Sequence, residues 1–263
     1  MPDYHLHTSL CRHATGTARA YKAVAQRRGL PEIAFTDHMP NPDGHDPDQR
    51  MTLEEWSLYQ QMVMELQAPG APRVLFGGEA DYYEGCERFL RPFLASTAFD
   101  VVIGSIHCLG DWCFDNPAEL QRWAAVDVEG VWRAYFELLG RFAGSGLVDV
   151  VGHLDLPKKF GHRPGDHIVR ELAQPALDRI AAAELCIEIN TAGLRKPVQE
   201  IYPSAMLLAL ARERNISICF GSDAHRPEEV GYNFEAALRL AKEAGYTEAV
   251  RFAARRKTAY PLP

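Results

Sequence analysis

Tyr4-His5-Leu6-His7-Thr8 places two histidines two residues apart at the end of a short apolar run. Residues i and i+2 of a strand point to the same face, so both imidazoles can reach one ion. Further polar groups end apolar runs at Asp37-His38, Glu79, His107, His153-Leu154-Asp155 and Asp223-Ala224-His225, and His13 follows the first run. Strand ends meet at one point when the strands close into a barrel, which is how a multinuclear metal site is built. The pattern predicts a metallohydrolase.

The apolar runs alternate with longer helical patterns. Strands are expected at 3–7, 32–37, 73–79, 100–107, 147–153, 185–190 and 216–222. Helices are expected at 15–29, 52–67, 85–95, 127–145, 166–184, 203–214 and 227–244. This alternation is typical of parallel βαβ units. Seven units suit a barrel with one strand fewer than the usual eight, so the predicted fold is α/β, a TIM-like (β/α)7 barrel.

Size and composition bound the class of protein. The chain has 263 residues, of which 47% are hydrophobic and 24% charged, with a net charge of -7. We predict one domain over residues 1–263, because no linker, repeat or low-complexity tract interrupts it. The negative charge makes nucleic-acid binding unlikely on physical grounds. The sequence leaves homo-oligomerisation open.

The chain shows neither a signal peptide nor an apolar run near the ~18 residues of a membrane span, so we expect a cytoplasmic protein without membrane contact. Its six cysteines form no CxxC pair and several lie in apolar runs. We therefore expect reduced, structural cysteines. Cys11 and Cys108 flank motif histidines and are secondary candidates for metal contact.

Together, the motifs from His5 to His225 resemble the PHP (polymerase and histidinol phosphatase) superfamily, and the length is similar to that of its histidinol-phosphate phosphatases. The resemblance implies a distorted (β/α)7 barrel with the metal site at the C-terminal ends of the strands. The implied ligands are His5, His7, Glu79 and Asp223 for one ion, His107 and His153 with bridging Glu79 for a second, and His13, His38 and His225 for a third. Nitrogen and oxygen ligands without thiolate suit two or three divalent ions of Zn, Mn or Fe.

Other polar residues near the strand ends are candidates for supporting roles. Asp37 and Asp155 are expected to orient histidines, and Glu188 and Asn190 are expected beside the site or against the substrate. Candidate phosphate-binding cations follow the last three strands, at Lys158, Lys159, Arg195, Lys196 and Arg226. Arg195 is favoured because its planar fork matches phosphate oxygens.

The residues that would bind the organic part of the substrate are less clearly indicated by the sequence. Candidates for a pocket wall are Tyr82, Tyr83, Trp112 and Phe114, and Asp81 is a candidate partner for an amine. Residues 39–51 are rich in Pro, Asp and Gly and are expected to form a loop at the same face, a candidate lid that carries His45.

The resemblance implies hydrolysis of L-histidinol phosphate, a step of histidine biosynthesis. We expect a hydroxide that bridges metal ions held apart by Glu79 to be the nucleophile. No covalent enzyme intermediate is expected. Asp223, His225 or a metal-bound water would supply the proton for the leaving alkoxide.

Two alternatives stay open. The same site could act on another phosphomonoester, a phosphodiester or nucleic-acid ends. A non-enzymatic barrel could use the metals for structure or regulation, although structural sites usually close their coordination.

Overall fold

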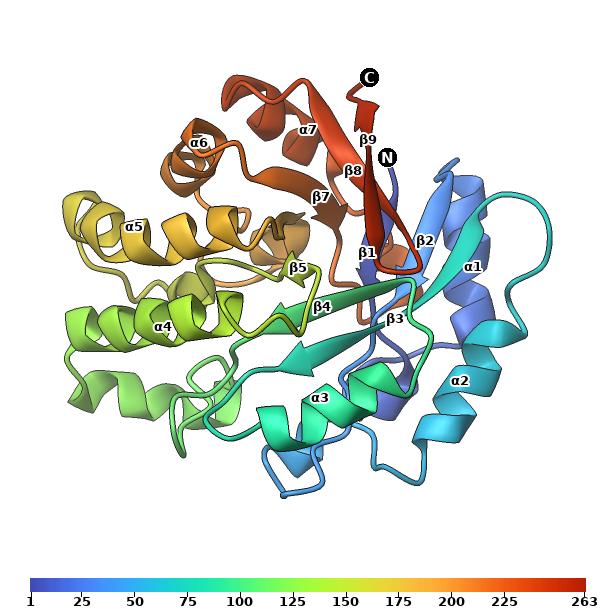
Figure 1. Ribbon diagram of the computed structural model, residues 1–263, viewed down its shortest axis with the longest axis horizontal. Coiled ribbons are helices and arrows are strands. Elements are labelled where there is room, and N and C mark those ends of the chain that lie inside the picture. The colour runs from blue at the N-terminus through green and yellow to red at the C-terminus, as the bar shows by residue number, and fades with distance from the viewer.

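The computed structural model describes residues 1–263, and its main feature is one sheet of seven parallel strands in the order β1-β2-β3-β4-β5-β6-β7. The strands are β1 (Asp3–Leu6), β2 (Glu32–Phe35), β3 (Arg73–Asp81), β4 (Val101–Ser105), β5 (Val150–Val151), β6 (Cys186–Asn190) and β7 (Ser217–Gly221). Both edges approach each other, because the Ala224 amide donates to the His5 carbonyl at 3.1 Å and the His7 amide donates to the Ala224 carbonyl at 3.0 Å. The sheet is therefore a nearly closed barrel, and the predicted (β/α)7 architecture is confirmed (Figure 1).

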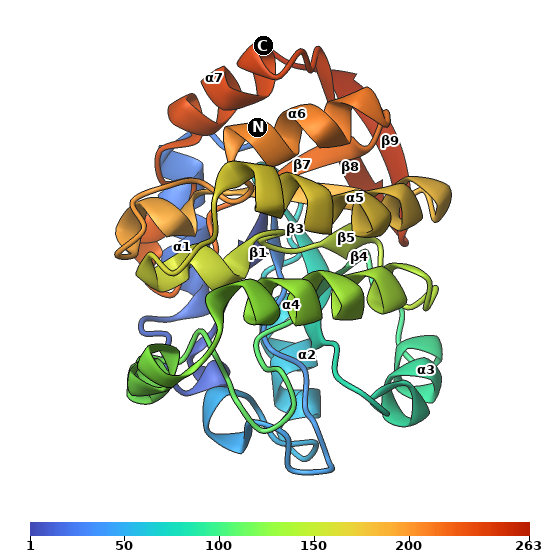
Figure 2. The ribbon, with the colours of Figure 1, turned by 90° about the vertical axis from the view of Figure 1, so that its left-hand side faces the viewer.

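Seven helices surround the strands. They are α1 (Ala18–Arg27), α2 (Trp56–Met64), α3 (Glu87–Ala95), α4 (Val128–Ala143), α5 (Asp166–Ala182), α6 (Ala205–Glu213) and α7 (Phe234–Glu243). Helices α4, α5 and α6 lie side by side along one flank of the barrel (Figure 2). No helix combines the length and apolar character that crossing a membrane requires.

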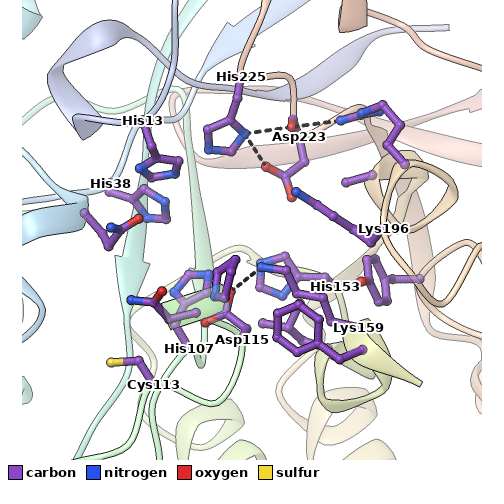
Figure 3. Close-up of a pocket in the computed structure, with 18 of the residues that line it drawn as sticks. His13, His38, His107, Cys113, Asp115, His153, Lys159, Lys196, Asp223 and His225 are labelled. Atoms are coloured by element: carbon purple, nitrogen blue, oxygen red, sulfur yellow. Dashed lines mark hydrogen bonds and ion pairs between the residues drawn. The ribbon is translucent and has the colours of Figure 1, made fainter. Parts of the chain in front are cut away.

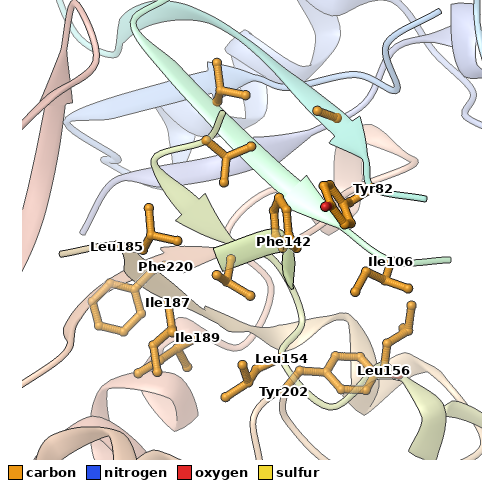
Figure 4. Packing of buried hydrophobic residues seen from close by; sticks show 14 of the residues in the cluster. Tyr82, Ile106, Phe142, Leu154, Leu156, Leu185, Ile187, Ile189, Tyr202 and Phe220 are labelled. Carbon is orange, nitrogen blue, oxygen red and sulfur yellow. The ribbon is translucent and has the colours of Figure 1, made fainter. Parts of the chain in front are cut away.

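The hydrophobic core has two parts. The larger part packs the helices against the outer face of the strands, and Figure 4 shows Phe142 of α4 beside Tyr82 and Ile106 in this layer. The smaller part fills the barrel between the strands. It contains Tyr4, Ala34, Leu75, Val101, Ile103, Val150, Cys186, Cys219, Val250 and Phe252. The barrel interior between the strands is thus filled mainly by apolar side chains.

An antiparallel hairpin, β8 (Glu248–Ala253) and β9 (Arg256–Pro261), follows the last helix and was not expected from the sequence. Its turn residues Ala254 and Arg255 have φ of 47° and 62°, a conformation usually marked by Asn or Gly. The turn sequence therefore carries no hairpin signature. Val250 and Phe252 from β8 enter the barrel core.

Two other predicted elements differ from the structure. The fifth strand is only Val150–Val151, shorter than the predicted 147–153. The predicted helix 227–244 is divided into a short 3-10 turn at Pro227–Glu229 and α7. The break at Gly231 has a physical reason, because its amide donates to the buried carboxylate of Asp3 at 2.7 Å and ties this segment to β1.

The expectation of reduced cysteines is wrong at one pair. Cys108 and Cys113 form a disulfide, whereas Cys11, Cys86, Cys186 and Cys219 are free and buried. A tight turn brings the pair together, since Leu109 and Trp112 exchange backbone hydrogen bonds of 2.8 and 3.2 Å.

Candidate metal centre and substrate cavity

The side chains predicted as metal ligands gather at the C-terminal end of the barrel. His5 belongs to β1 and Glu79 to β3, and the others follow strand ends. His7 follows β1, His38 follows β2, His107 follows β4, His153 follows β5, and Asp223 and His225 follow β7. His13 comes from the loop between β1 and α1. Parallel strands place these groups together because their carboxyl ends share one face.

Glu79 lies at the centre of the cluster and is 1% exposed. Its Oε2 is 3.0 Å from His38 Nδ1, 3.4 Å from His5 Nε2 and 3.7 Å from His7 Nε2. Its Oε1 is 3.2 Å from His153 Nε2 and 3.7 Å from His107 Nε2. One carboxylate therefore faces five imidazoles, the arrangement expected of a bridging group.

A second carboxylate, Asp223, closes the other side of the cluster. Its Oδ1 is 3.2 Å from His7 Nε2 and 3.4 Å from His225 Nδ1. The His225 ring stacks on His7 with centroids 4.0 Å apart and on His13 with centroids 4.5 Å apart. Figure 3 shows His13, His38 and His225 on one side of the cavity and His107 and His153 on another.

His38 is shared between groups that the family resemblance separates. It forms one close set with Glu79 and His107 and another with His7 and His225. His13 groups with His225 and with Cys11. Cys11 is free and buried, and it also groups with His7 and Asp37.

Six buried atoms of the cluster residues have no hydrogen-bond partner in the protein. They are His5 Nε2, His7 Nε2, His38 Nδ1, Glu79 Oε2, His153 Nδ1 and His225 Nε2. Each buried polar atom left unpaired costs about 1–3 kcal/mol. Their convergence indicates a site built for cations, and a set of imidazole nitrogens and carboxylate oxygens fits Zn, Mn or Fe.

The electrostatics of the cluster also favour cations. Burial would raise the pKa of Glu79, but the neighbouring imidazoles of His38, His5 and His107 lower it well below its usual value. Burial would lower the pKa of His5, yet the carboxylates of Glu188, Glu79 and Asp223 raise it well above its usual value. The carboxylates thus stay ionised and hold positive charge beside them, which protons or metal ions can supply.

Three of the four predicted supporting residues contact the cluster. Glu188 Oε1 is 2.8 Å from His5 Nδ1, and its Oε2 accepts from the His153 amide at 3.2 Å. Asn190 Nδ2 donates to Glu188 Oε2 at 3.0 Å and is 3.4 Å from Asp223 Oδ2. Asp37 Oδ1 is 3.4 Å from His7 Nδ1 and accepts from the His38 amide at 2.8 Å. Such contacts fix the ring orientation of a ligating histidine.

Gly221 makes this close approach of β6 and β7 possible. A Cβ at this position would lie 1.7 Å from Glu188 Oε1 and 2.8 Å from His5 Cβ. Any side chain would displace the Glu188 carboxylate from His5.

Asp155 and Lys158 do not take their predicted places. Asp155 Oδ2 is 2.9 Å from Lys158 Nζ and accepts from the Ser204 amide at 2.9 Å, and it contacts no histidine side chain. Lys158 is fully buried, lies 3.0 Å from Glu200 and donates to the Ile201 carbonyl, so it does not reach the cavity. The pair instead fastens the short helix Leu156–Phe160 to the segment after β6.

Two further residues contact the cluster and were not predicted from the sequence to do so. Asp81 Oδ1 is 3.0 Å from His107 Nδ1, and its other oxygen pairs with the buried guanidinium of Arg50. Asp81 is therefore not free to bind a substrate amine. Ser105 Oγ donates to Glu79 Oε1 at 2.5 Å. Both stand two residues from a predicted ligand on the same strand or its extension, so the two-residue period was a usable sign.

A cavity of about 590 Å³ opens above the cluster. Four cations line it, namely Lys159, Arg195, Lys196 and Arg226. Arg195 is held by Nη2, which donates to the Ser222 carbonyl at 2.8 Å and the Asp223 carbonyl at 3.1 Å, while its buried Nη1 has no partner. Lys159 Nζ lies 2.9 Å from Asp115 Oδ2.

The predicted aromatic wall differs from the observed one. Tyr82, Trp112 and Phe114 are buried in the hydrophobic core and do not line the cavity, which Phe160 and Tyr202 line instead. Tyr83 stacks on His45 at 3.9 Å outside it. The 39–51 loop does reach the mouth, through Asp46 and Gln49.

Known proteins are similar to this chain in sequence and in fold. A model of the PHP domain family matches residues 3–192, and a PHP-associated model matches residues 206–253. A probable histidinol-phosphatase of Deinococcus radiodurans is 45% identical over 92% of this chain and 93% of its own length. The histidinol-phosphatase of Bacillus subtilis is 30% identical over 90% of this chain and 97% of its own length.

A solved structure supports the architecture. Histidinol phosphate phosphatase of Lactococcus lactis, in complex with zinc, L-histidinol and phosphate, superposes with a TM-score of 0.82 over 98% of both chains at 24% identity. At this identity the likeness supports the distorted barrel alone. The matching family model spans most of the barrel and every strand up to β6, so this chain belongs to the PHP domain family.

Proposed function

We propose that this protein is a metal-dependent phosphomonoesterase that hydrolyses L-histidinol phosphate to L-histidinol and phosphate. One observation carries the proposal: unpartnered imidazole and carboxylate atoms converge directly beneath a cavity lined by four cations. The ligand cluster suits divalent metals and the cations suit a phosphate dianion. The names of the relatives at 45% and 30% identity supply the substrate.

Up to three ions would be held by the nine predicted ligands, with His5, His7 and Asp223 on one side of Glu79 and His107 and His153 on the other. His13, His38 and His225 complete the set. Bound divalent ions supply Lewis-acid polarisation of the phosphate and a water of lowered pKa. Glu79 fixes the separation of the ligand groups because both of its oxygens face imidazoles.

The residues of the chain bind and orient the phosphate ester and assist protonation of the leaving alkoxide. Arg195 presents its free Nη1 to the phosphate, and Lys159, Lys196 and Arg226 complete the positive wall. Asp223 and His225 also line the cavity, so they can orient the water that protonates the departing alkoxide. His225 Nδ1 lies 3.4 Å from Asp223 Oδ1, which places both side chains at the same point of the cavity wall.

The experiment is steady-state phosphate release by protein of measured metal content, with L-histidinol phosphate, an aryl phosphate and a phosphodiester. We expect kcat/KM for L-histidinol phosphate of at least about 10⁴ M⁻¹s⁻¹, within the usual enzyme range. It should clearly exceed the other two values. Equal, weak rates on all three would contradict L-histidinol phosphate as the substrate. They would remain consistent with a phosphoesterase that acts on another ester. A preference for the diester would move the function to phosphodiesters or nucleic-acid ends.

A further inference from the structure

The loop between β4 and the 3-10 helix that follows it forms one wall of the cavity. This 106–116 loop begins beside the ligand residue His107 and supplies Cys113 and Asp115 to the cavity lining. Asp115 Oδ2 lies 2.9 Å from Lys159 Nζ, so the loop also holds one of the four cations. Figure 3 shows Cys113 on the same side of the cavity as His107 and Asp115. A change in the loop therefore reaches both the ligand cluster and the positive wall.

A disulfide between Cys108 and Cys113 closes the middle of this loop into a small hairpin. Leu109 and Trp112 exchange backbone hydrogen bonds of 2.8 and 3.2 Å across the hairpin, and Gly110 at its turn has a φ of 63°. An isolated two-stranded hairpin is at best marginally stable in water. The covalent bond is therefore the strongest tie within the hairpin.

Trp112 carries a local conflict in the closed loop. Its side chain is 5% exposed and packs against Trp123, with ring centroids 5.0 Å apart. Its buried Nε1 has no hydrogen-bond partner in the protein, whereas Trp123 Nε1 donates to the Phe114 carbonyl at 2.9 Å. A buried donor without an acceptor is unfavourable, and movement of Trp112 towards water would satisfy it. The closed loop thus combines favourable burial of a ring with an unsatisfied donor, so its balance depends on the disulfide.

The two sulfur atoms differ in access from the solvent. Cys113 is half-buried and lines the cavity, whereas Cys108 is 2% exposed and does not line it. The four remaining cysteines are free and buried. A thiolate that enters the cavity therefore meets the sulfur of Cys113, and Cys108 becomes the leaving group.

We propose that the Cys108–Cys113 disulfide is a thiol–disulfide exchange site, through which a dithiol reductant converts the cavity wall from a closed form to an open form. In the closed, oxidised form the loop holds His107 and Lys159 in place. In the open, reduced form this support is lost, so metal affinity and turnover both fall.

The exchange proceeds in two balanced steps. A thiolate of the reductant attacks Cys113 Sγ, forms a mixed disulfide and expels the Cys108 thiolate, which takes up a proton. The second thiolate of the reductant then attacks the reductant sulfur of the mixed disulfide and releases the Cys113 thiolate, which is also protonated. Two electrons and two protons pass to the protein, and the dithiol becomes a disulfide.

The test uses the zinc-loaded protein and dithiothreitol as the dithiol. The reagent is removed by anaerobic gel filtration, and zinc is restored before measurement. Thiol titration of the denatured protein reports the redox state, with four free thiols when the disulfide is intact and six after its reduction. We expect reduction to lower zinc affinity, measured by competition with a chelator, and kcat/KM for phosphate release about 10- to 100-fold each, the range for lost support of a ligating histidine. Oxidised glutathione should restore both values.

Two variants serve as controls. The double variant Cys108→Ser/Cys113→Ser should have the zinc affinity of the reduced wild type before any treatment. It should not respond to dithiothreitol, which separates the switch from binding of zinc by the reagent. Cys86→Ser removes a buried free thiol outside the pair and should respond as the wild type does.

The measurements on the wild type decide the proposal even if the double variant fails to fold. Four thiols both before and after dithiothreitol would overturn the exchange site. Six thiols with unchanged zinc affinity and unchanged kcat/KM would overturn the switch and make the disulfide a structural link alone. Zinc affinity is measured without any substrate, so failure of this inference is distinguishable from failure of the proposed function.

Discussion

Glu188 organises the metal cluster without facing the cavity. It is fully buried, and its two oxygens contact His5 Nδ1, the His153 amide and Asn190. By engaging Nδ1, it leaves His5 Nε2 free to face Glu79. A residue of this kind acts by orienting another, so its loss should weaken metal binding before it changes the chemistry.

We expect Glu188→Gln to reduce metal affinity and kcat/KM about 10- to 100-fold, because a neutral amide no longer stabilises the His5 ring orientation. Metal content after dialysis against graded chelator, measured by mass spectrometry, gives the affinity directly. Glu184→Gln, an exposed acid after α5, is the control. Wild-type metal retention in Glu188→Gln would show that the contact is dispensable.

Arg195 has one free donor, and its loss should affect substrate binding. We expect Arg195→Ala to raise KM for phosphate esters about 10- to 100-fold with a smaller effect on kcat, because the hydrogen bond to charged phosphate is lost. Steady-state kinetics measures both constants. Arg239→Ala, on the exposed side of α7, should change neither. An unchanged kcat/KM in Arg195→Ala would remove this residue from the phosphate site.

At the scale of elements, the 39–51 loop is anchored by one buried cation. Arg50 is 2% exposed, pairs with Asp81, and donates to the Met39 carbonyl at 3.1 Å and the Asp46 carbonyl at 2.9 Å. This anchor holds the base of the loop to β3, while Asp46 and Gln49 reach the cavity mouth. Closure of the loop over substrate stays a prediction.

We expect Arg50→Met to destabilise the fold by about 3–5 kcal/mol at neutral pH, because Asp81 is left as an unpaired buried charge. Burial would raise the pKa of Asp81, but Arg50 and His107 hold it below its ordinary value of 3.8. The pair therefore stabilises the protein above that value and loses its contribution as the pH falls through the folded pKa.

The destabilisation by Arg50→Met should be smaller near about pH 5 than near about pH 8, since the unpaired, buried Asp81 then takes up a proton. Urea unfolding at both pH values measures it. Arg50→Lys keeps the charge and should lose less stability than Arg50→Met. A pH-independent loss would mean that packing, not charge, dominates at this position.

The β8–β9 hairpin closes the end of the barrel opposite the metal cluster. Phe252 meets Tyr4 edge-to-face at 5.3 Å, and Arg255 pairs with Asp149 just before β5. We expect Phe252→Ala to lower the free energy of unfolding by about 3–5 kcal/mol, because the smaller side chain leaves a cavity. Urea unfolding measures this change. The kcat/KM of this variant should match that of the wild type. The control Thr258→Ala, at an exposed position, should change neither the free energy of unfolding nor kcat/KM. A large kinetic effect would contradict the separation of core and site.

At the scale of the whole molecule, we propose that residues 1–263 form one folding unit. The two family models cover separate stretches, but β1 pairs with the segment after β7 and Asp3 accepts from Ser222 and Gly231. Neither stretch closes the barrel alone. A single cooperative unfolding transition is the expected behaviour.

Removal of metal should abolish turnover and leave the barrel largely intact, because the hydrophobic core lies apart from the ligand cluster. The midpoint of thermal unfolding should fall, since buried carboxylates and imidazoles lose their partners. Circular dichroism and activity, measured before and after chelation and again after Zn or Mn is restored, test both statements. Loss of the helical signal on chelation would instead support a structural role for the metals.

The amino-acid sequence by itself was sufficient to predict the barrel and to predict that the ligand residues lie together at one end of it. The reason is local: strand ends follow apolar runs, the two-residue period sets which side chains share a face, and parallel strands bring their carboxyl ends together. His5, His7 and Glu79 were predictable in this way, and His5 Nε2 and His7 Nε2 lie 3.4 and 3.7 Å from Glu79 Oε2 in the structure.

Only the tertiary structure decided which charges face the cavity. Lys158 and Lys159 are neighbours in sequence, yet Lys158 is buried against Asp155 and Lys159 reaches the cavity beside Asp115. Arg50 and Asp81 are 31 residues apart and pair only because the loop folds back on β3. Such pairings depend on how distant segments desolvate one another, which no local pattern encodes.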